Sequence, residues 1–271
     1  MAAQADEPPL VVVKWGGSII TRKRDVEKPR PKVLARLARE LAAARGPPIV
    51  LLHGAGSFGH PGARRFGLAA APDPAVPPAE RIRGAAIVAT EVRRLHLLVL
   101  KELVRAGVAP ASVPMATHAW NRAGSLESLD ASPIAEASRR GLLPVSFGDV
   151  VPDRAWGASI LSADTIALAL AQQLRVGRVI FVSDVPGILE GPPTGRRAVV
   201  AEVTDRALDQ LRPGPGAPDV TGGIRGKANA MRAIARAHVD AVLISGLTDG
   251  ELSRAIRGES VYGSWAHADP R

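Results

Sequence analysis

Two glycine-rich segments each follow a short apolar run, an arrangement in which backbone groups can hold phosphate. The first is Lys14-Trp15-Gly16-Gly17-Ser18, at the end of the apolar run 10–15. Glycines at the carboxyl end of a strand let backbone N–H groups approach a ligand closely, and a lysine adds a point charge suited to phosphate. A tight strand-to-helix turn with an ordinary surface lysine would have the same sequence. This segment alone leaves both interpretations open.

The second segment is His53-Gly54-Ala55-Gly56-Ser57-Phe58-Gly59-His60, after the apolar run 49–52. It contains the pattern G-x-G-x-x-G, but a dinucleotide site needs a further strand ending in an acidic residue about 20 positions on, and the stretch 71–78 is rich in proline. The segment therefore indicates a phosphate cradle. His60 would donate a hydrogen bond to a phosphate oxygen there. The alternative is a structural or helix-capping histidine.

A third segment, 221–227, opens a helix expected to run to about residue 237. Thr221 is a suitable N-cap, and the N–H groups that follow, Gly223 among them, form an anion site. Lys227 lies one turn inside and would reach a β- or γ-phosphate. The segment is not a Walker A motif, because Thr221 stands where that motif has its first glycine. A capped surface helix is the alternative.

Two acidic residues complete the candidate site. Asp164 lies in the first turn of a predicted helix, after a predicted loop at 148–151. The helix dipole alone explains it, although it would also orient basic groups or bind metal-bound water. Asp184 follows a predicted strand, in a loop that would hold a base or ribose, or is a simple turn. With Lys14, Lys23 and Lys227 converging, the set suits phosphoryl transfer, where catalysis is mostly positioning and charge neutralisation.

The elements that must position these residues alternate along the chain. Apolar runs typical of buried strands are followed or preceded by helical patterns, of which 31–45 and 80–106 are the clearest. This alternation predicts an α/β fold with a mostly parallel sheet covered on both faces. We expect a flexible N-terminus at 1–9 and a single domain at 10–271, with loops at 71–78, 190–197 and 212–218. The strand runs are 10–15, 49–52, 142–146, 178–183 and 241–245.

Composition narrows the function classes. Hydrophobic residues make up 46% of the chain and aromatic residues 3%, and there is no cysteine, so a globular fold without disulfides or thiolate chemistry is expected. No signal-peptide pattern and no apolar run of ~18 residues is present, so we expect a cytoplasmic protein without a membrane segment. The net charge of +9 is scattered and few aromatic residues accompany it, which favours steering of small phosphorylated substrates over nucleic-acid binding.

Taken together, the segments resemble the amino acid kinase family, and most specifically its isopentenyl phosphate kinases. Segment 16–23 is similar to the pattern G-G-S-x-I-T-x-K, and segment 53–60 is similar to H-G-G-G-S-F-G-H. Gly67-Leu68 and Phe147-Gly148-Asp149 also fit. The resemblance extends from Val11 to about Ser245. Ala55 departs from it by replacing a glycine, and its methyl group would crowd a backbone contact to the substrate.

The resemblance implies a three-layer α/β/α sandwich, usually in a homodimer, with an acceptor-binding half to about residue 150 and a nucleotide-binding half after it. It implies ATP-dependent phosphorylation of isopentenyl phosphate to the diphosphate, in the alternative mevalonate route of isoprenoid biosynthesis. A monoester acceptor, whose second pKa is about 6, needs cations more than a base. Mg²⁺ would be held by the nucleotide and waters, without a protein metal cage.

The resemblance also implies a role for each matching residue. Lys14, Lys23 and Lys227 would neutralise phosphates, and His60 would bond the acceptor phosphate. The residues implied on the ATP side are Lys14, Gly16, Gly17, Ser18, Gly56, Asp164, Asp184, Gly223 and Lys227. Those implied on the substrate side are Ala55, Gly59, His60 and Gly148.

Three other functions remain open from the sequence. A fosfomycin kinase shares the fold and a similar histidine-bearing loop, and the wall of the acceptor pocket would separate the two. The pattern Thr21-x-Lys23 favours the isopentenyl phosphate kinase. An apolar, elongated cavity, with the predicted helix at 82–98 in its wall, would favour the prenyl phosphate. A non-catalytic nucleotide-binding regulator and a nucleic-acid binder are the remaining alternatives.

Overall fold

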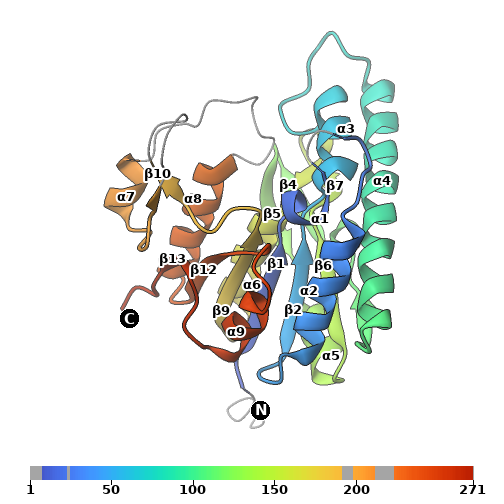
Figure 1. Cartoon of the computed structure of the whole chain (residues 1–271). Helices are drawn as coiled ribbons and strands as arrows, with labels where there is room; N and C mark the ends of the chain where they lie inside the picture. Colours follow the sequence, from blue (N-terminus) through green and yellow to red (C-terminus); the bar gives the residue numbers. More distant parts are fainter. Residues whose placement is uncertain (1–7, 23–24, 191–197, 211–222, 271) are drawn as a thin grey trace, which may run out of the picture.

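A seven-stranded sheet forms the centre of the molecule (Figure 1). The computed structural model describes residues 8–22, 25–190, 198–210 and 223–270. The strands of the sheet lie in the order β13-β12-β9-β1-β2-β6-β3. Their bounds are β1 Leu10–Trp15, β2 Ile49–His53, β3 Pro110–Ser112, β6 Leu143–Phe147, β9 Val176–Ser183, β12 Asp240–Ser245 and β13 Gly263–Ala266.

All neighbouring strands of this sheet are parallel except β12 and β13. β1 lies between β2 and β9, and Val12 and Val13 on it are fully buried although they point to opposite faces. A parallel strand covered on both faces is apolar throughout, which is why each such strand was recognisable as a continuous apolar run. The predicted mostly parallel α/β fold is confirmed.

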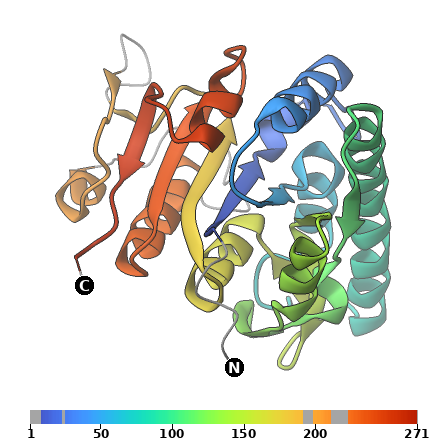
Figure 2. The same cartoon turned by 90° about the horizontal axis from the view of Figure 1, so that it is seen from below.

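Helices cover both faces of the sheet (Figures 1 and 2). α2 (Pro31–Ala43), α4 (Pro78–Arg105) and α9 (Glu251–Arg257) pack on one face, in a cluster that includes Val13 and Trp15. α5 (Ser132–Arg139), α6 (Ala163–Gln173) and α8 (Gly223–Arg236) pack on the other, in a cluster that includes Val12. The helical spacing of apolar residues at 31–45 and 80–106 therefore predicted α2 and α4 correctly, within a few residues at their ends.

A second, four-stranded sheet consists of one strand pair between β3 and α5 and another between β6 and α6, and the sequence did not predict it. Its order is β5 (Ser125–Leu129), β4 (Ala119–Arg122), β7 (Asp149–Asp153) and β8 (Gly157–Leu161). The expectation of a loop at 148–151 was wrong, because β7 begins at Asp149 and pairs with β8 over its whole length. Asp153 ends the strand by accepting hydrogen bonds from the turn N–H groups of Trp156 (2.8 Å) and, across the sheet, Gly124 (2.8 Å).

The remaining described elements are short. They are α1 (Gly17–Ile20), the 3₁₀ turns η1 (Gly56–Phe58) and η2 (Met115–Thr117), α3 (His60–Arg65), the strand pair β10 (Leu189–Glu190) and β11 (Ala198–Val199), and α7 (Asp205–Gln210). The predicted loop at 71–78 lies outside helices and strands as far as Pro77. The predicted loops at 190–197 and 212–218, and the predicted flexible N-terminus at 1–9, lie wholly or largely outside the described residues. No described helix is long and apolar enough to cross a membrane.

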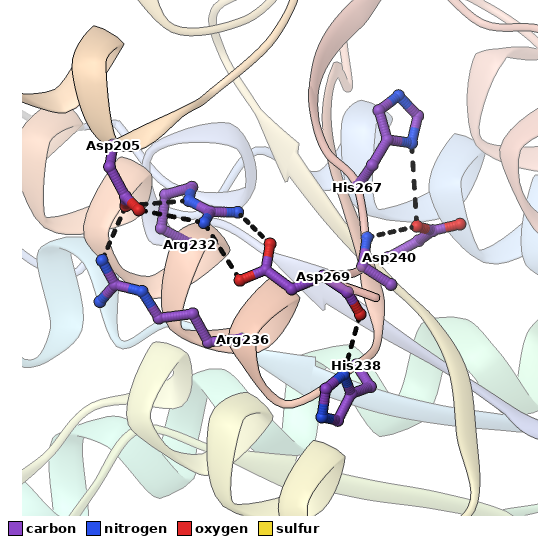
Figure 3. A network of polar contacts seen from close by, with 8 residues as sticks. Asp205, Arg232, Arg236, His238, Asp240, His267 and Asp269 are labelled. Atoms are coloured by element: carbon purple, nitrogen blue, oxygen red, sulfur yellow. Dashed lines mark hydrogen bonds and ion pairs between the residues drawn. The ribbon is translucent and has the colours of Figure 1, made fainter. Parts of the chain in front are cut away.

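A polar network fixes the C-terminal half of α8 (Figure 3). Arg232, which is 8% exposed, bridges Asp205 of α7 (3.1 Å) and Asp269 of the C-terminal segment (3.2 Å). Arg236 also pairs with Asp205 (2.7 Å). A bidentate guanidinium between two carboxylates holds its partners in a defined orientation. The network therefore ties α7 and the end of the chain to the helix whose first turns carry Gly223 and Lys227.

Candidate phosphate-binding site

The two glycine segments lie against each other at the carboxyl ends of β1 and β2. The strands are parallel neighbours, and the Gly54 N–H donates to the Trp15 carbonyl at 2.9 Å. A Cβ atom on Gly17 would lie 2.5 Å from the Gly56 backbone nitrogen, which is closer than real Cβ contacts. Glycine is therefore required at position 17 by the approach of the second loop. The predicted approach of a ligand to these glycines stays a prediction.

Thr21 joins the two loops. Its hydroxyl donates to the Gly17 carbonyl (2.7 Å) and accepts from the Ser57 N–H (2.9 Å). Gly56 has φ +51°, in the left-handed region, and a Cβ there would overlap the Thr21 side chain. The sequence analysis included Thr21 only as one position of the motif at 16–23. Its bridging role could not be predicted, because a hydroxyl that joins two segments produces no periodic pattern in the sequence.

Lys14 is buried near the carboxyl end of β1, beside the two glycine loops. Its Nζ lies 2.6 Å from Asp164 Oδ1, and the two residues are 6% and 8% exposed. Asp164 is in the first turn of α6, whose N-cap Ser162 accepts from the Thr165 N–H at 3.0 Å. The interpretation of Lys14 as an ordinary surface lysine was wrong. Asp164 contacts a basic group, as one of the roles considered for it requires, and its role in catalysis stays a prediction. A buried ammonium at a strand end suits an anion.

A third loop, which begins at Asp184 after β9, contacts the first glycine loop. Asp184 accepts a hydrogen bond from Ser18 (2.6 Å), and the Gly16 N–H donates to the Val182 carbonyl (2.8 Å). The first glycine loop is thus held between the ends of β2 and β9. The structure brings together seven of the nine residues expected on the ATP side, namely Lys14, Gly16, Gly17, Ser18, Gly56, Asp164 and Asp184.

Of the residues expected on the acceptor side, three belong to the second loop and the fourth, Gly148, lies beside it. The Gly148 N–H donates to the His53 carbonyl at 2.9 Å, which joins β6 to β2 at this edge. Ala55 has a right-handed helical backbone (φ −73°), so alanine is unstrained there. Its methyl group faces Gly59, where an added Cβ would come within 2.5 Å of it, and it packs against the cluster that contains Val92. The predicted crowding of a backbone contact to substrate by Ala55 stays a prediction.

The other expected site residues lie at element ends. His60 is the first residue of α3, Gly223 is the first of α8, and the half-buried Lys227 is in the second turn of α8. Lys23 and the predicted N-cap Thr221 lie outside the described residues. The convergence of Lys23, Lys227 and Gly223 on the glycine loops stays a prediction.

A cavity of about 740 Å³ lies beside the second loop, between α3 and α4. Pro61, Phe66 and Ile87 give it apolar surface, but Arg65 and Glu91 also line it. Burial, followed by repulsion from Glu27, raises the pKa of the Glu91 carboxyl. α4 thus contributes to the wall of this cavity, which is mixed rather than apolar. The expectation that the helix at 82–98 lines the acceptor pocket stays a prediction.

A buried polar cluster behind the second loop was not predicted. His53 Nε2 lies 3.0 Å from His96 Nδ1, and His96 Nε2 lies 2.8 Å from Ser112 Oγ. Burial lowers the pKa of His53 to about 4 and that of His96 to about 3. Beside them Asp149, whose pKa is raised by burial, pairs with Arg93 at 3.1 Å. The available signal was a single histidine among the apolar residues of the helix predicted at 80–106.

This histidine pair is expected to make the protein less stable in acid. Between pH 6.5 and about 4 the unfolded chain binds protons that the folded pair does not, so the free energy of unfolding falls as the pH falls through this window. Melting temperatures recorded from pH 7.5 to 4.5 test this. The slope should flatten in His96→Asn and persist in His118→Asn, a histidine outside the pair. An unchanged slope in His96→Asn would contradict the assignment.

With this geometry established, comparisons with known proteins identify the family. The model of the "Amino acid kinase family" matches residues 9–245. The chain belongs to the amino acid kinase family. It is 32% identical to an isopentenyl phosphate kinase of Methanothermobacter thermautotrophicus over 94% of this chain and 98% of that one. Another isopentenyl phosphate kinase, from Haloferax volcanii, is 34% identical over 85% of this chain and 90% of its own length.

A solved structure agrees with these sequence relatives. The structure titled "X-ray structures of isopentenyl phosphate kinase" superposes with a TM-score of 0.83 at 28% identity, covering 95% of this chain and 99% of that one. The similarity to isopentenyl phosphate kinases thus extends over nearly the full length of both proteins, as the motifs indicated. The predicted three-layer fold is confirmed with it.

Proposed function

We propose that this protein transfers the γ-phosphoryl group of ATP to isopentenyl phosphate. The observation that carries the proposal is the loop 53–60, locked by its glycines against the loop of Lys14, in a chain whose relatives over nearly their full length are isopentenyl phosphate kinases. A nonbridging oxygen of the acceptor phosphate attacks the γ-phosphorus, the bond to the β–γ bridging oxygen breaks, and ADP leaves. No proton has to be removed, because the acceptor is already ionised near neutral pH.

The described residues suit a reaction that depends on charge neutralisation. Lys14 supplies a buried cation, and the glycine loops supply N–H donors at the same sheet edge. Asp164 already pairs with Lys14 and Asp184 with Ser18, so these carboxylates fit orienting roles better than a metal cage. We therefore expect Mg²⁺ to enter bound to the nucleotide phosphates, where it would neutralise charge on the transferred group.

The test is ADP release with ATP and Mg²⁺, comparing isopentenyl, dimethylallyl and geranyl phosphates with fosfomycin at equal concentrations. We expect strong preference for the five-carbon phosphates. Preference for fosfomycin would contradict the proposed acceptor but would agree with the proposed phosphate-binding residues. The comparison is needed because the wall of the cavity is mixed rather than apolar. Absence of turnover with all four would overturn the proposal.

His60 is expected to act on the acceptor. It opens α3 directly after the second glycine loop, so His60→Ala should lower turnover at least tenfold by removing a donor to the acceptor phosphate. The dissociation constant for ATP should stay unchanged, because the side chain is expected to touch the acceptor and not the nucleotide. Steady-state kinetics combined with calorimetric ATP titration checks both. Turnover equal to that of the unchanged protein would remove His60 from the mechanism.

The expected assembly and location are also proposals. We propose a homodimer that works in the cytoplasm, where ATP is available. Leu97 and Val104, one heptad apart on α4, are 51% and 61% exposed, which supports a contact surface along that helix. Light scattering after size-exclusion chromatography measures the mass, and a monomer at micromolar concentration would contradict the dimer.

A further inference from the structure

A chain of buried hydrogen bonds runs from the acceptor loop to the edge of the sheet. It links His53 at the end of β2, His96 in the middle of α4, and Ser112 on β3. At its loop end, His53 Nδ1 lies 3.1 Å from the Gly54 carbonyl oxygen. His53 is fully buried and His96 is 5% exposed. Both ring nitrogens of both histidines therefore have a partner within the protein.

Only one arrangement of hydrogens satisfies this chain with neutral rings. A carbonyl oxygen only accepts, so His53 Nδ1 carries the hydrogen and donates to Gly54. His53 Nε2 must then accept, which requires His96 Nδ1 to donate to it. His96 Nε2 in turn accepts from the Ser112 hydroxyl. The Gly54 carbonyl thus places the His53 hydrogen on Nδ1, and a hydrogen bond donated by His96 to Nε2 stabilises the same tautomer.

The tautomer of His53 matters because it orients the peptide between Gly54 and Ala55. In a trans peptide the carbonyl and the N–H point in opposite directions, and the described part of the chain contains no cis peptide. A Gly54 carbonyl held by His53 therefore directs the Ala55 N–H to the opposite side. Among the described residues, that N–H finds no hydrogen-bond acceptor. It is thus available to an anion at the loop.

His53 also holds the second glycine expected at the acceptor. Its backbone carbonyl accepts from the Gly148 N–H at 2.9 Å, and its ring stacks on Phe147 with centroids 5.4 Å apart. Phe147 is covered in turn by the Arg93 guanidinium, 5.8 Å from the ring centroid. Because burial lowers the pKa of both histidines well below neutrality, the neutral arrangement persists across the working pH range. His53 therefore contacts the backbone of both Gly54 and Gly148.

We propose that His96 is a positioning residue for the phosphate-monoester acceptor: by donating to His53 Nε2 it keeps the His53 Nδ1–H on the Gly54 carbonyl, which aims the Ala55 N–H at the phosphate. This inference rests on the proposed kinase function. His96 touches neither substrate, so its effect should fall on the acceptor and leave the nucleotide unaffected.

Two amide variants separate positioning from packing. In His96→Asn the side-chain amide stands where Nδ1 stood and can still donate to His53, whereas in His96→Gln it stands where Nε2 stood and reaches Ser112 instead. We expect kcat/KM for isopentenyl phosphate to fall at least tenfold in His96→Gln and less than threefold in His96→Asn. The KM for ATP should change less than twofold in both. Equal losses in the two variants, or a loss shared by ATP, would overturn the proposal.

A measurement on the unchanged protein keeps the test decisive even if a variant unfolds. Nitrogen-15 NMR of the histidine rings should show His53 as the Nδ1–H tautomer from pH 6 to 8, with signals that do not titrate. A His53 Nε2–H tautomer would overturn the proposal whatever the kinetics. If the NMR result holds but no acceptor is turned over by the unchanged protein, the proposed function fails and the geometry of the loop stands.

Discussion

Replacing Lys14 with methionine is expected to lower turnover by about a hundred- to a thousandfold, the range seen when one preorganised electrostatic donor is removed from an active site. Lys14 is the cation that the structure places between the two glycine loops and α6, and methionine keeps much of its length without its charge. The loss should appear in kcat at saturating ATP and acceptor, because repulsion between the two anionic substrates is greatest as the phosphoryl group moves.

The same substitution is expected to destabilise the protein, and that effect must be separated from catalysis. Removing one partner of a buried ion pair costs about 3–5 kcal/mol, and here the buried Asp164 carboxylate would lose its contact with the Lys14 ammonium. The double variant Lys14→Met/Asp164→Asn removes both charges and should recover much of the melting temperature. It should recover none of the activity. A double variant that is stable and active would show that the ammonium has no role in phosphoryl transfer.

The sequence predicted the parts of the fold whose signal is local. Buried parallel strands are continuous apolar runs, so β1 and β2 could be recognised without knowing their neighbours. The glycine loops followed from their position after those strands, because carboxyl ends of parallel strands share one edge of a sheet. Their mutual contact at Gly17 and Gly56 agrees with that expectation.

The parts that escaped prediction depend on partners far away in the chain. In the sequence, Asp164 is explained by the dipole of the helix in whose first turn it lies. Only the fold brings it into contact with Lys14, which lies 150 positions earlier. β7 has only five residues, including Pro152, and its sequence shows no clear alternation of apolar and polar residues. Part of what holds it is a set of turn contacts to Asp153, which the sequence does not reveal. His96 reads as one polar residue in an apolar helix face. Its significance appears only when α4 packs it against His53.

Gly17→Ala is expected to remove nearly all activity, by at least about a hundredfold, through a backbone clash. Its Cβ would stand 2.5 Å from the nitrogen and 2.6 Å from the Cα of Gly56. Both atoms belong to the backbone, so no side-chain rotation relieves the contact, and one of the two loops must move. A displacement of about 1 Å in a group that positions a substrate is enough for a hundredfold loss. The affinity for ATP should fall with turnover, because the loop is expected to line the nucleotide phosphates.

Gly46→Ala is the matched control, because a Cβ at Gly46 meets nothing within 4 Å. It makes the same chemical change just before β2, at the end of that strand opposite to the second loop, and it should leave kcat, KM and melting temperature nearly unchanged. Comparing the two variants by kinetics and thermal melting separates the general effect of adding a methyl group from the effect of moving the cradle. If Gly17→Ala kept both its activity and its melting temperature, the second loop would have room to retreat without consequence. The close approach of the two loops would then be incidental to phosphate binding, and the tight Gly17–Gly56 contact would have to be explained by packing alone.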